Sequence, residues 1–382
     1  MDVIVIGGGI VGLASGYYLS RRGASVIVFE KESLGNGSTE RSAGGIRRQF
    51  STPVNVSLSK ASVPVWEYFE ETFGVDIEFR RNGYLFLARS AETADTFSDI
   101  VTMQNDLDVP TRLLARSAVA DLVPALHGDR FEAGMYLDTD GFVDPHLALQ
   151  GIAQSLPAGA ELHTHTPVTD VLVTDGEVTG VIAGGERFEA DFVVNAAGPW
   201  GRDVAQMAGI DLPAYPRRRR ILVADPEIPI PETVPLVIDL DTGLYFRPER
   251  EGTALVGGHV GGSDDPDQNP DRFTETVGME YTHSALETAS EVAAYFGPET
   301  AVIRGWAGLY SLTPDRHPII EETLPGFVSA IGFSGHGFQH GPAVGKLVTE
   351  LVFDGEASLV DVSRLSSDRF DRGDLIEERN AV

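Results

Sequence analysis

A strand, a glycine-rich turn, a helix and a second strand in the first thirty-one residues constrain most strongly how this chain can fold. Residues 2–6 are a short apolar run rich in β-branched side chains, which is typical of a buried parallel strand. Gly7, Gly9 and Gly12 follow with the spacing G-x-G-x-x-G, and apolar residues then recur at helical spacing. Residues 25–29 are a second apolar run. The chain is therefore predicted to begin with a βαβ unit.

This unit has the properties of a dinucleotide clamp. Gly7 permits a tight turn, Gly9 lets the backbone approach a pyrophosphate, and Gly12 lets the helix pack closely on the strand. The helix N-terminus supplies unpaired N–H groups for phosphates. Glu30, directly after the second strand, is placed to accept hydrogen bonds from ribose hydroxyls. The order of the elements favours dinucleotide binding over a plain glycine turn, without specifying which dinucleotide.

Length and composition bound the possible classes. A chain of 382 residues exceeds one ordinary core, so two domains are expected. It has no cysteine, which excludes disulfides, thiolate metal ligands and a thiol-linked flavin. No apolar stretch predicts a membrane span, and the N-terminus shows no basic signal region, so we expect a cytoplasmic protein. The histidines form no metal-ligand pattern with carboxylates, and we assign no metal.

The charge balance is strongly acidic. There are 29 basic and 57 acidic residues, a net charge of −28, and only three lysines. Such a surface repels nucleic acid and anionic membranes. An acidic, lysine-poor chain is typical of a high-salt cytoplasm, where ions screen the self-repulsion. An ordinary acidic cytosolic protein is the alternative.

Two further segments favour ligand binding. Residues 193–198 (VVNAAG) are a buried strand that ends in small residues, where backbone approaches a ligand closely. Residues 332–345 (GFSGHGFQHGPAVG) expose N–H groups, and we expect Pro342 to begin a helix as its first residue. That helix N-terminus would stabilise negative charge on a reduced flavin ring.

The remaining pattern indicates two interleaved modules. Antiparallel-like strands begin after residue 216, a long helical region is expected over 274–296, and the polar tail after Asp361 is expected to be partly disordered. We predict an α/β fold with a Rossmann-like dinucleotide-binding domain interleaved with an antiparallel-sheet α+β domain. The first comprises residues 1–80, 144–215 and 305–382, and the second comprises 81–143 and 216–304.

Four motifs together resemble the D-amino-acid oxidase family of FAD enzymes. They are the glycine motif with Glu30, NAAGPW at 195–200, TPDRHP at 313–318 and GFSGHGF at 332–338. Within that family the chain looks most like the branch of sarcosine oxidase and of the dimethylglycine and proline dehydrogenase β-subunits. The loop GSTERSAGGIRRQF is similar to that branch as well.

The resemblance implies that the Rossmann-like domain is an FAD-binding domain and that the antiparallel-sheet α+β domain is the substrate domain. FAD would be bound across the N-terminal, middle and C-terminal parts of the chain. The residues it implies in cofactor binding are Gly7, Gly9, Ile10, Val11, Gly12, Glu30, Lys31, Ser38, Thr39, Arg41, Ser42, Ala43, Gly44, Gly45, Val168, Ala196, Ala197, Gly198, Trp200, Gly308, Gly335, His336, Gly337, Phe338 and Gln339.

It also implies substrate-binding residues. Arg47 matches the family's carboxylate-binding arginine, and a guanidinium pairs bidentately with a carboxylate. Arg48 is its rival. Tyr245 and Arg247 lie on a strand that lines the family's substrate face, and alternation places both on the same side. His336, between glycines, is expected near the flavin.

Some positions depart from the family pattern. Gly308 stands where monomeric sarcosine oxidases have the cysteine that anchors flavin. The histidine that some dimethylglycine enzymes use for attachment aligns near Arg41. FAD is therefore expected to be bound non-covalently. Leu255 falls at about the position of the lysine that assists oxygen in monomeric sarcosine oxidases, and Gln339 replaces the lysine of the C-terminal loop. The loss of both lysines favours a dehydrogenase over an oxidase. Tyr310 stands where glycine oxidases have an arginine after the sequence A-G-L. Recognition of the substrate carboxylate must then come from another residue, which again favours Arg47.

The leading hypothesis is FAD-dependent oxidation of the C–N bond of an amino acid or N-methylated amine, similar to sarcosine, dimethylglycine or proline. Its electron acceptor would be oxygen or a partner subunit. A second hypothesis is a flavin-carrying subunit that needs a multi-subunit electron-transfer assembly. A third is FAD-dependent oxidation of a hydroxy compound such as a polyol phosphate, for which the arginines at 217–220 are the one supporting feature. We interpret that run as a strand with solvated or acid-paired side chains.

Overall fold

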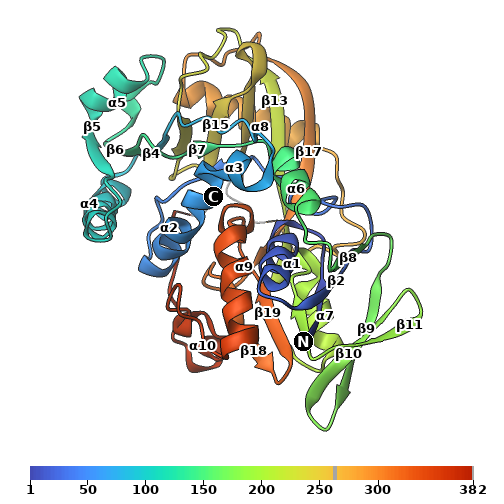
Figure 1. Cartoon of the computed structure of the whole chain (residues 1–382). Helices are drawn as coiled ribbons and strands as arrows, with labels where there is room; N and C mark the ends of the chain where they lie inside the picture. Colours follow the sequence, from blue (N-terminus) through green and yellow to red (C-terminus); the bar gives the residue numbers. More distant parts are fainter. Residues whose placement is uncertain (261–264, 381–382) are drawn as a thin grey trace.

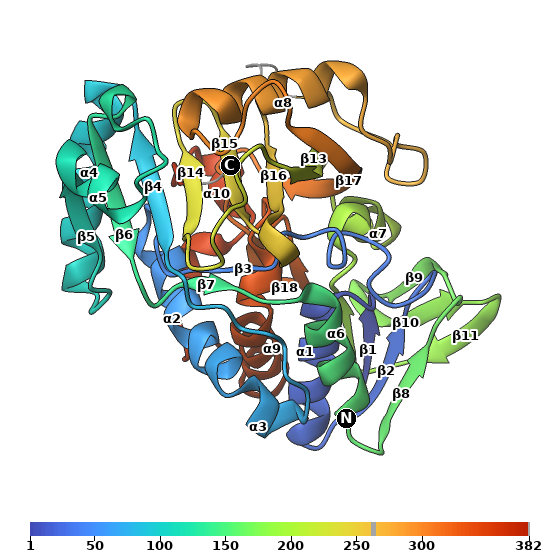
Figure 2. The same cartoon turned by 90° about the horizontal axis from the view of Figure 1, so that it is seen from above.

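The computed structural model describes residues 1–260 and 265–380 and contains two principal β-sheets (Figure 1). One is a six-stranded, mainly parallel sheet, and the other is an eight-stranded, mainly antiparallel sheet. Helices α4 (Ala91–Asp106) and α5 (Arg116–Leu122) lie on one side of the molecule in both views. The small sheet of β9 (Val168–Thr174), β10 (Glu177–Ala183) and β11 (Glu186–Glu189) lies on the opposite side (Figure 2). The predicted α/β fold class is confirmed.

The six-stranded sheet has the order β18-β19-β12-β1-β2-β8. Its strands are β1 (Asp2–Ile6), β2 (Ser25–Phe29), β8 (Ala160–His163), β12 (Phe192–Asn195), β18 (Ile319–Leu324) and β19 (Phe327–Ile331). All neighbours pair in parallel except β18, which runs antiparallel to β19. The sheet thus joins strands from the beginning, middle and end of the chain.

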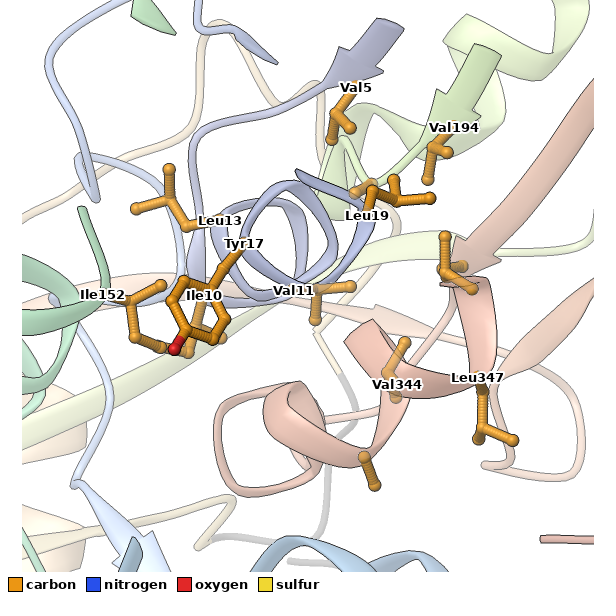
Figure 3. Close-up of a cluster of buried hydrophobic side chains, with 14 of the residues drawn as sticks. Val5, Ile10, Val11, Leu13, Tyr17, Leu19, Ile152, Val194, Val344 and Leu347 are labelled. Carbon is orange, nitrogen blue, oxygen red and sulfur yellow. The ribbon is translucent and has the colours of Figure 1, made fainter. Parts of the chain in front are cut away.

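Helices α1 (Ile10–Arg21) and α9 (Gly337–Asp354) pack together beside this sheet. A Cβ added at Gly345 would lie 2.6 Å from the carbonyl carbon of Ala14, so the two helices approach through a glycine. Figure 3 shows the resulting core, in which Val5 and Val344 are fully buried. This packing fixes the direction of both helix N-termini.

The eight-stranded sheet has the order β17-β13-β16-β15-β14-β4-β6-β5. Its strands are β4 (Tyr84–Ala88), β5 (Arg112–Ala115), β6 (Ala133–Leu137), β13 (Tyr215–Asp225), β14 (Leu236–Asp239), β15 (Leu244–Pro248), β16 (Ala254–Gly258) and β17 (Ala301–Leu312). Helix α8 (Met279–Val292) covers one face through Tyr281 and Val292. The opposite face carries Tyr245 and Ile238.

The other elements connect or flank these sheets. They are β3 (Gly45–Ile46), α2 (Pro53–Glu67), α3 (Phe69–Phe73), α4 (Ala91–Asp106), α5 (Arg116–Leu122), η1 (Gly128–Arg130), β7 (Gly141–Phe142), α6 (Pro145–Gln154), β9 (Val168–Thr174), β10 (Glu177–Ala183), β11 (Glu186–Glu189), η2 (Gly198–Trp200), α7 (Gly201–Met207), η3 (Arg250–Gly252), η4 (Ser363–Leu365) and α10 (Asp368–Arg372).

Three expectations are corrected by the structure. Pro342 is the sixth residue of α9 rather than its first, because the helix begins at Gly337. Proline lacks an N–H, so α9 loses one hydrogen bond there, which buried packing tolerates. The helical region predicted over 274–296 contracts to α8, after Gly278. Upstream, the Glu275 carbonyl accepts a bond from the Ala307 N–H instead.

The third correction concerns the polar tail. Its described residues are packed on the protein, because Arg369 forms a buried ion pair with Asp315 at 2.8 Å and Glu378 is fully buried, while residues 381–382 lie outside the described residues. β13 and β17 each cross a predicted domain boundary, at 215/216 and 304/305, and the division into domains stays a prediction. None of the helices in the described residues is long and apolar enough to cross a bilayer.

Candidate active site

A cavity of about 470 Å³ lies between the two sheets. One wall is formed where the strands of the six-stranded sheet end, at Gly7 after β1, Glu30 after β2 and Ala196 after β12. The opposite wall is the face of the eight-stranded sheet that carries Tyr245 and Ile238. The carboxyl ends of parallel strands are where ligands bind in open α/β sheets.

The glycine turn has the close geometry that its spacing predicts. Gly7 has φ of +111°, a region that side chains rarely adopt, and a Cβ added at Gly12 would overlap the Gly7 carbonyl oxygen. Glu30 accepts a hydrogen bond from the Gly8 N–H at 2.7 Å. The acid is thereby held beside the turn.

The N-terminus of α1 faces the cavity. Its N-cap is Gly9, which has no side chain to cap the helix, and its first turn holds no acidic residue. Thr39 Oγ1 accepts a hydrogen bond from the Ile10 N–H at 3.1 Å, and Val11 lines the cavity. The partial positive charge of the helix end is therefore available to phosphates.

Contacts between distant segments join residues that line the cavity around Lys31. Lys31 forms an ion pair with Asp271 at 2.5 Å and lies 4.0 Å from the centre of the Trp200 ring. The Trp200 Nε1–H donates to the same carboxylate at 2.8 Å. Nearby, Arg41 pairs with Glu275 at 2.9 Å.

His336 is buried against the cavity as the N-cap of α9. Its ring meets Phe50 edge to face, with centroids 4.9 Å apart. Neither ring nitrogen has a hydrogen-bond partner within the described residues. Burial, reinforced by the charge of Arg47, holds the His336 pKa well below its usual value, so the ring is neutral.

Arg47 is a buried cation that lines the cavity. Its Nη1 donates to the Gln49 carbonyl and its Nη2 to the Asn380 carbonyl at 2.9 Å, while its guanidinium lies 3.9 Å from the Phe50 ring centre. Over residues 1–260 and 265–380 no carboxylate lies within ion-pair distance of it. The Gln339 side chain accepts a bond from the Arg47 N–H at 2.8 Å. Burial lowers the Arg47 pKa.

The other candidate residues around the substrate face differ in their surroundings. Tyr245 is buried and lines the cavity, and burial raises its pKa well above the usual value. Arg247 lies on the same face of β15 but contacts Glu249 at 2.5 Å and the Phe142 ring at 4.4 Å. Arg48 pairs with Asp140 at 3.0 Å. Its charge is already balanced there.

The structure brings nearly all the predicted residues to this one cavity. Those predicted residues that do not line it are Gly12, Gly44 and Arg247. Gly12 serves the packing of α1, whereas a Cβ added at Gly44 would overlap the Val143 carbonyl oxygen. Arg247 donates to the Ala43 carbonyl at 3.2 Å and so supports the cavity wall from behind.

Sequence reasoning missed residues that line the end of the cavity near Arg47 and Tyr245, which we call the substrate end. Tyr84 and the apolar Ile221 line it from β4 and β13, and Tyr310, which was considered only as a replacement for an arginine, lines it from β17. Arg219 also lines the cavity, with its guanidinium 5.5 Å from the Tyr310 ring centre. Alternation within strand 84–88 was the available signal for Tyr84. The arginine run forms a strand as interpreted, and Arg220 pairs with Asp265 at 2.8 Å.

Comparisons with known proteins agree with this geometry. The family described as FAD dependent oxidoreductase (DAO) matches residues 2–351. FAD-dependent oxidoreductase domain-containing protein 1 of Xenopus laevis is 31% identical over 100% of this chain and 85% of its own length. Glycine oxidase of Geobacillus kaustophilus (strain HTA426) is 28% identical, over 92% of each chain.

Among solved structures, L-proline dehydrogenase from P. horikoshii superposes with a TM-score of 0.89 at 33% identity, covering 98% of each chain. The fold, the cavity between two sheets and the family match are those of a dinucleotide-binding oxidoreductase. The chain belongs to the DAO family of FAD-dependent oxidoreductases.

The residues present fit FAD. The uncapped end of α1 suits the pyrophosphate, and Glu30, beside the turn, suits the ribose. The buried His336, whose ring nitrogens have no partner within the described chain, suits a polar group from a ligand. A Cβ added at Gly308 would lie 3.0 Å from the Arg41 side chain, and non-covalent binding of FAD stays a prediction.

Proposed function

We propose that the protein oxidises the C–N bond of an amino acid or N-methylated amine whose carboxylate binds Arg47. The observation that supports this proposal is a buried guanidinium in the cavity wall with no carboxylate partner among the described residues. A guanidinium has five N–H donors, and Arg47 spends two of them on backbone carbonyls. The remaining donors suit a bidentate substrate carboxylate.

The protein's part in the reaction is to bind, orient and exclude water. Tyr84, Tyr245 and Tyr310 surround the substrate end of the cavity, and Arg47 anchors one end of the substrate. The neutral His336, whose ring nitrogens have no partner among the described residues, can accept a hydrogen bond from a ligand group in the cavity. When bound, FAD would supply the two-electron oxidant, with flavin N5 as the acceptor of the hydride from the carbon next to nitrogen. Water would hydrolyse the resulting imine.

A compact, proline-like substrate is the preferred candidate. Ile221, Leu236 and Ile238 line the substrate end, and they suit an apolar ring better than a charged side chain. The similarity to an L-proline dehydrogenase, at 33% identity across nearly the whole chain, supports this choice. Sarcosine and dimethylglycine remain smaller candidates of the same class.

We propose a dehydrogenase rather than an oxidase. The position that resembles the oxygen-assisting lysine of sarcosine oxidases is Leu255, which is buried in an apolar cluster. Gln339 is neutral, and its side chain is occupied by the Arg47 N–H. A positive charge at either position is therefore missing. The electron acceptor would then be a partner rather than oxygen.

An anaerobic reduction screen tests the proposal. The purified holoenzyme is mixed with L-proline, sarcosine, dimethylglycine, glycine and D-amino acids, and the flavin absorbance is followed. Bleaching by an amine, with little peroxide when the assay is repeated in air, is the expected result. Bleaching by glycerol 3-phosphate alone would instead support oxidation of a hydroxy compound. No bleaching by any compound would support a flavin-carrying subunit that needs its partners.

A further inference from the structure

The segment that follows α10 enters the protein beside the active site. Glu378 and Asn380 are both fully buried, whereas Glu377 and Arg379 are exposed. The alternation directs every second side chain inward. Neither buried residue lines the cavity, so the segment lies behind the wall that carries Arg47.

The Glu378 carboxylate binds the N-terminal end of α2. It accepts hydrogen bonds from the Ser51 N–H at 2.8 Å, the Ser51 hydroxyl at 2.7 Å and the Asn55 amide at 2.9 Å. Thr52, the N-cap of α2, makes no capping bond of its own but donates to the same carboxylate at 3.1 Å. A carboxylate at a helix N-terminus is stabilised by the unpaired N–H groups and the helix dipole.

Asn380 completes a frame around the arginine. Its carbonyl accepts a bond from Arg47 Nη2 at 2.9 Å, and its side-chain amide donates to the Gln49 carbonyl at 3.3 Å. Gln49 is also the acceptor for Arg47 Nη1. The Glu378 carboxylate in turn accepts a bond from the Asn380 N–H at 3.0 Å. One continuous set of hydrogen bonds therefore joins Glu378 to the guanidinium.

We propose that Glu378 and Asn380 are positioning residues that hold the Arg47 guanidinium in the orientation in which it binds the substrate carboxylate. The inference rests on the proposed function, because it assumes that Arg47 is that cation. An arginine side chain has several rotatable bonds, and fixing them before binding removes an entropic cost from substrate affinity. Without the frame, Arg47 would still be present but would bind a carboxylate more weakly.

Binding of a carboxylate that is not oxidised tests the proposal directly. Pyrrole-2-carboxylate and its uncharged counterpart pyrrole-2-carboxamide are titrated into the holoenzyme, and the flavin absorbance reports binding. In Glu378→Ala the carboxylate is expected to bind about tenfold more weakly, whereas the carboxamide is unchanged and FAD content is retained. The KM for an amino acid that the enzyme oxidises should rise, whereas kcat should change by less than about twofold. Glu377→Ala, an exposed neighbour of the same type, is the matched control.

The variants separate the possible outcomes. Equal weakening of both probes in Glu378→Ala, or loss of FAD, would show a merely structural role and overturn the proposal. If this variant does not fold, Glu378→Gln keeps the shape without the charge. This variant should bind pyrrole-2-carboxylate about threefold more weakly, and an unchanged affinity would also overturn the proposal.

Arg47→Ala distinguishes this inference from the proposed function. Weaker carboxylate binding in Arg47→Ala but not in the Glu378 variants would remove only the positioning role. Unchanged carboxylate binding in Arg47→Ala would remove the carboxylate assignment and the positioning role with it. In an Arg47→Ala background, Glu378→Ala should cause no additional loss, because the group that it positions is gone.

Discussion

Arg47 and Asn380 lie 333 positions apart in the sequence and are joined by a hydrogen bond of 2.9 Å between Nη2 and the backbone carbonyl. The contact connects the loop before α2 to the segment after α10. An early and a late segment of the chain therefore support the same cavity wall. It also consumes a donor without neutralising the charge. That combination leaves a fixed cation available to a ligand.

Arg47→Ala should raise the KM for an amino-acid substrate roughly 100-fold while FAD stays bound, because charged hydrogen bonds to the carboxylate are lost. Arg47→Lys should recover part of this loss, since it keeps the charge but not the planar fork. Steady-state kinetics under a fixed acceptor concentration measure both. Arg48→Ala tests the rival arginine and should leave the KM within about threefold. A larger effect of Arg48 than of Arg47 would contradict the assignment.

Gly12→Ala should destabilise the protein by about 1–3 kcal/mol and weaken FAD retention, because the added methyl group overlaps the Gly7 carbonyl oxygen. Thermal unfolding and the flavin-to-protein absorbance ratio measure the two effects. Gly159→Ala is the control, since a Cβ there meets nothing within 4 Å. Equal behaviour of the two variants would argue against the tight packing of α1 on β1.

Asp271→Asn should speed the dissociation of FAD by up to about fivefold at low salt, because the contacts of Asp271 with Lys31 and Trp200 hold together segments that line the cavity. Fluorescence of released flavin after dilution gives the rate. The difference from the unmodified protein should shrink in roughly 1 M salt, where ion pairs are screened. Asp354→Asn breaks an exposed ion pair with Arg22, away from the cavity, and should not change the rate.

His340→Gln should reduce the loss of stability in acid. Burial lowers the His340 pKa to about 3, so the folded protein keeps this ring neutral while the unfolded chain takes up a proton below pH 6.5. The contribution of the neutral His340 ring to the free energy of unfolding is present above pH 6.5. It is lost as pH falls below 6.5, by roughly 1.4 kcal/mol per pH unit. Between pH 7 and pH 5, the free energy of unfolding measured with urea should therefore fall by about 2 kcal/mol less in the variant than in the unmodified protein. The same fall in both proteins would mean that His340 is protonated in the fold.

The net charge of −28 predicts that stability depends on salt. If the chain is adapted to a high-salt cytoplasm, its unfolding temperature should fall markedly as salt is removed, because unscreened carboxylates repel one another. A thermal scan from dilute buffer to molar salt measures this. Full stability in dilute buffer would support an ordinary acidic protein.

Local features were predictable because their causes lie within a few residues. The turn from Gly7 to Gly12 follows from steric requirements, and Asp144 caps α6 by accepting bonds from the His146 and Leu147 N–H groups. Pro342 shows the limit of such reasoning. A proline favours a first helical position, yet α9 extends five residues before it because its packing against α1 stabilises the earlier turn.

The sequence by itself determined the βαβ clamp, the family and the side-chain types at the cavity, since these depend on spacing and local conformation. Only the tertiary structure decided which of three candidate arginines has no acidic partner among the described residues: Arg48 meets Asp140 and Arg247 meets Glu249, whereas Arg47 meets backbone carbonyls. It also decided that Glu378 is buried rather than part of a loose tail. The physical reason is that a side chain's partner depends on which distant segment packs beside it, and no local pattern specifies that packing.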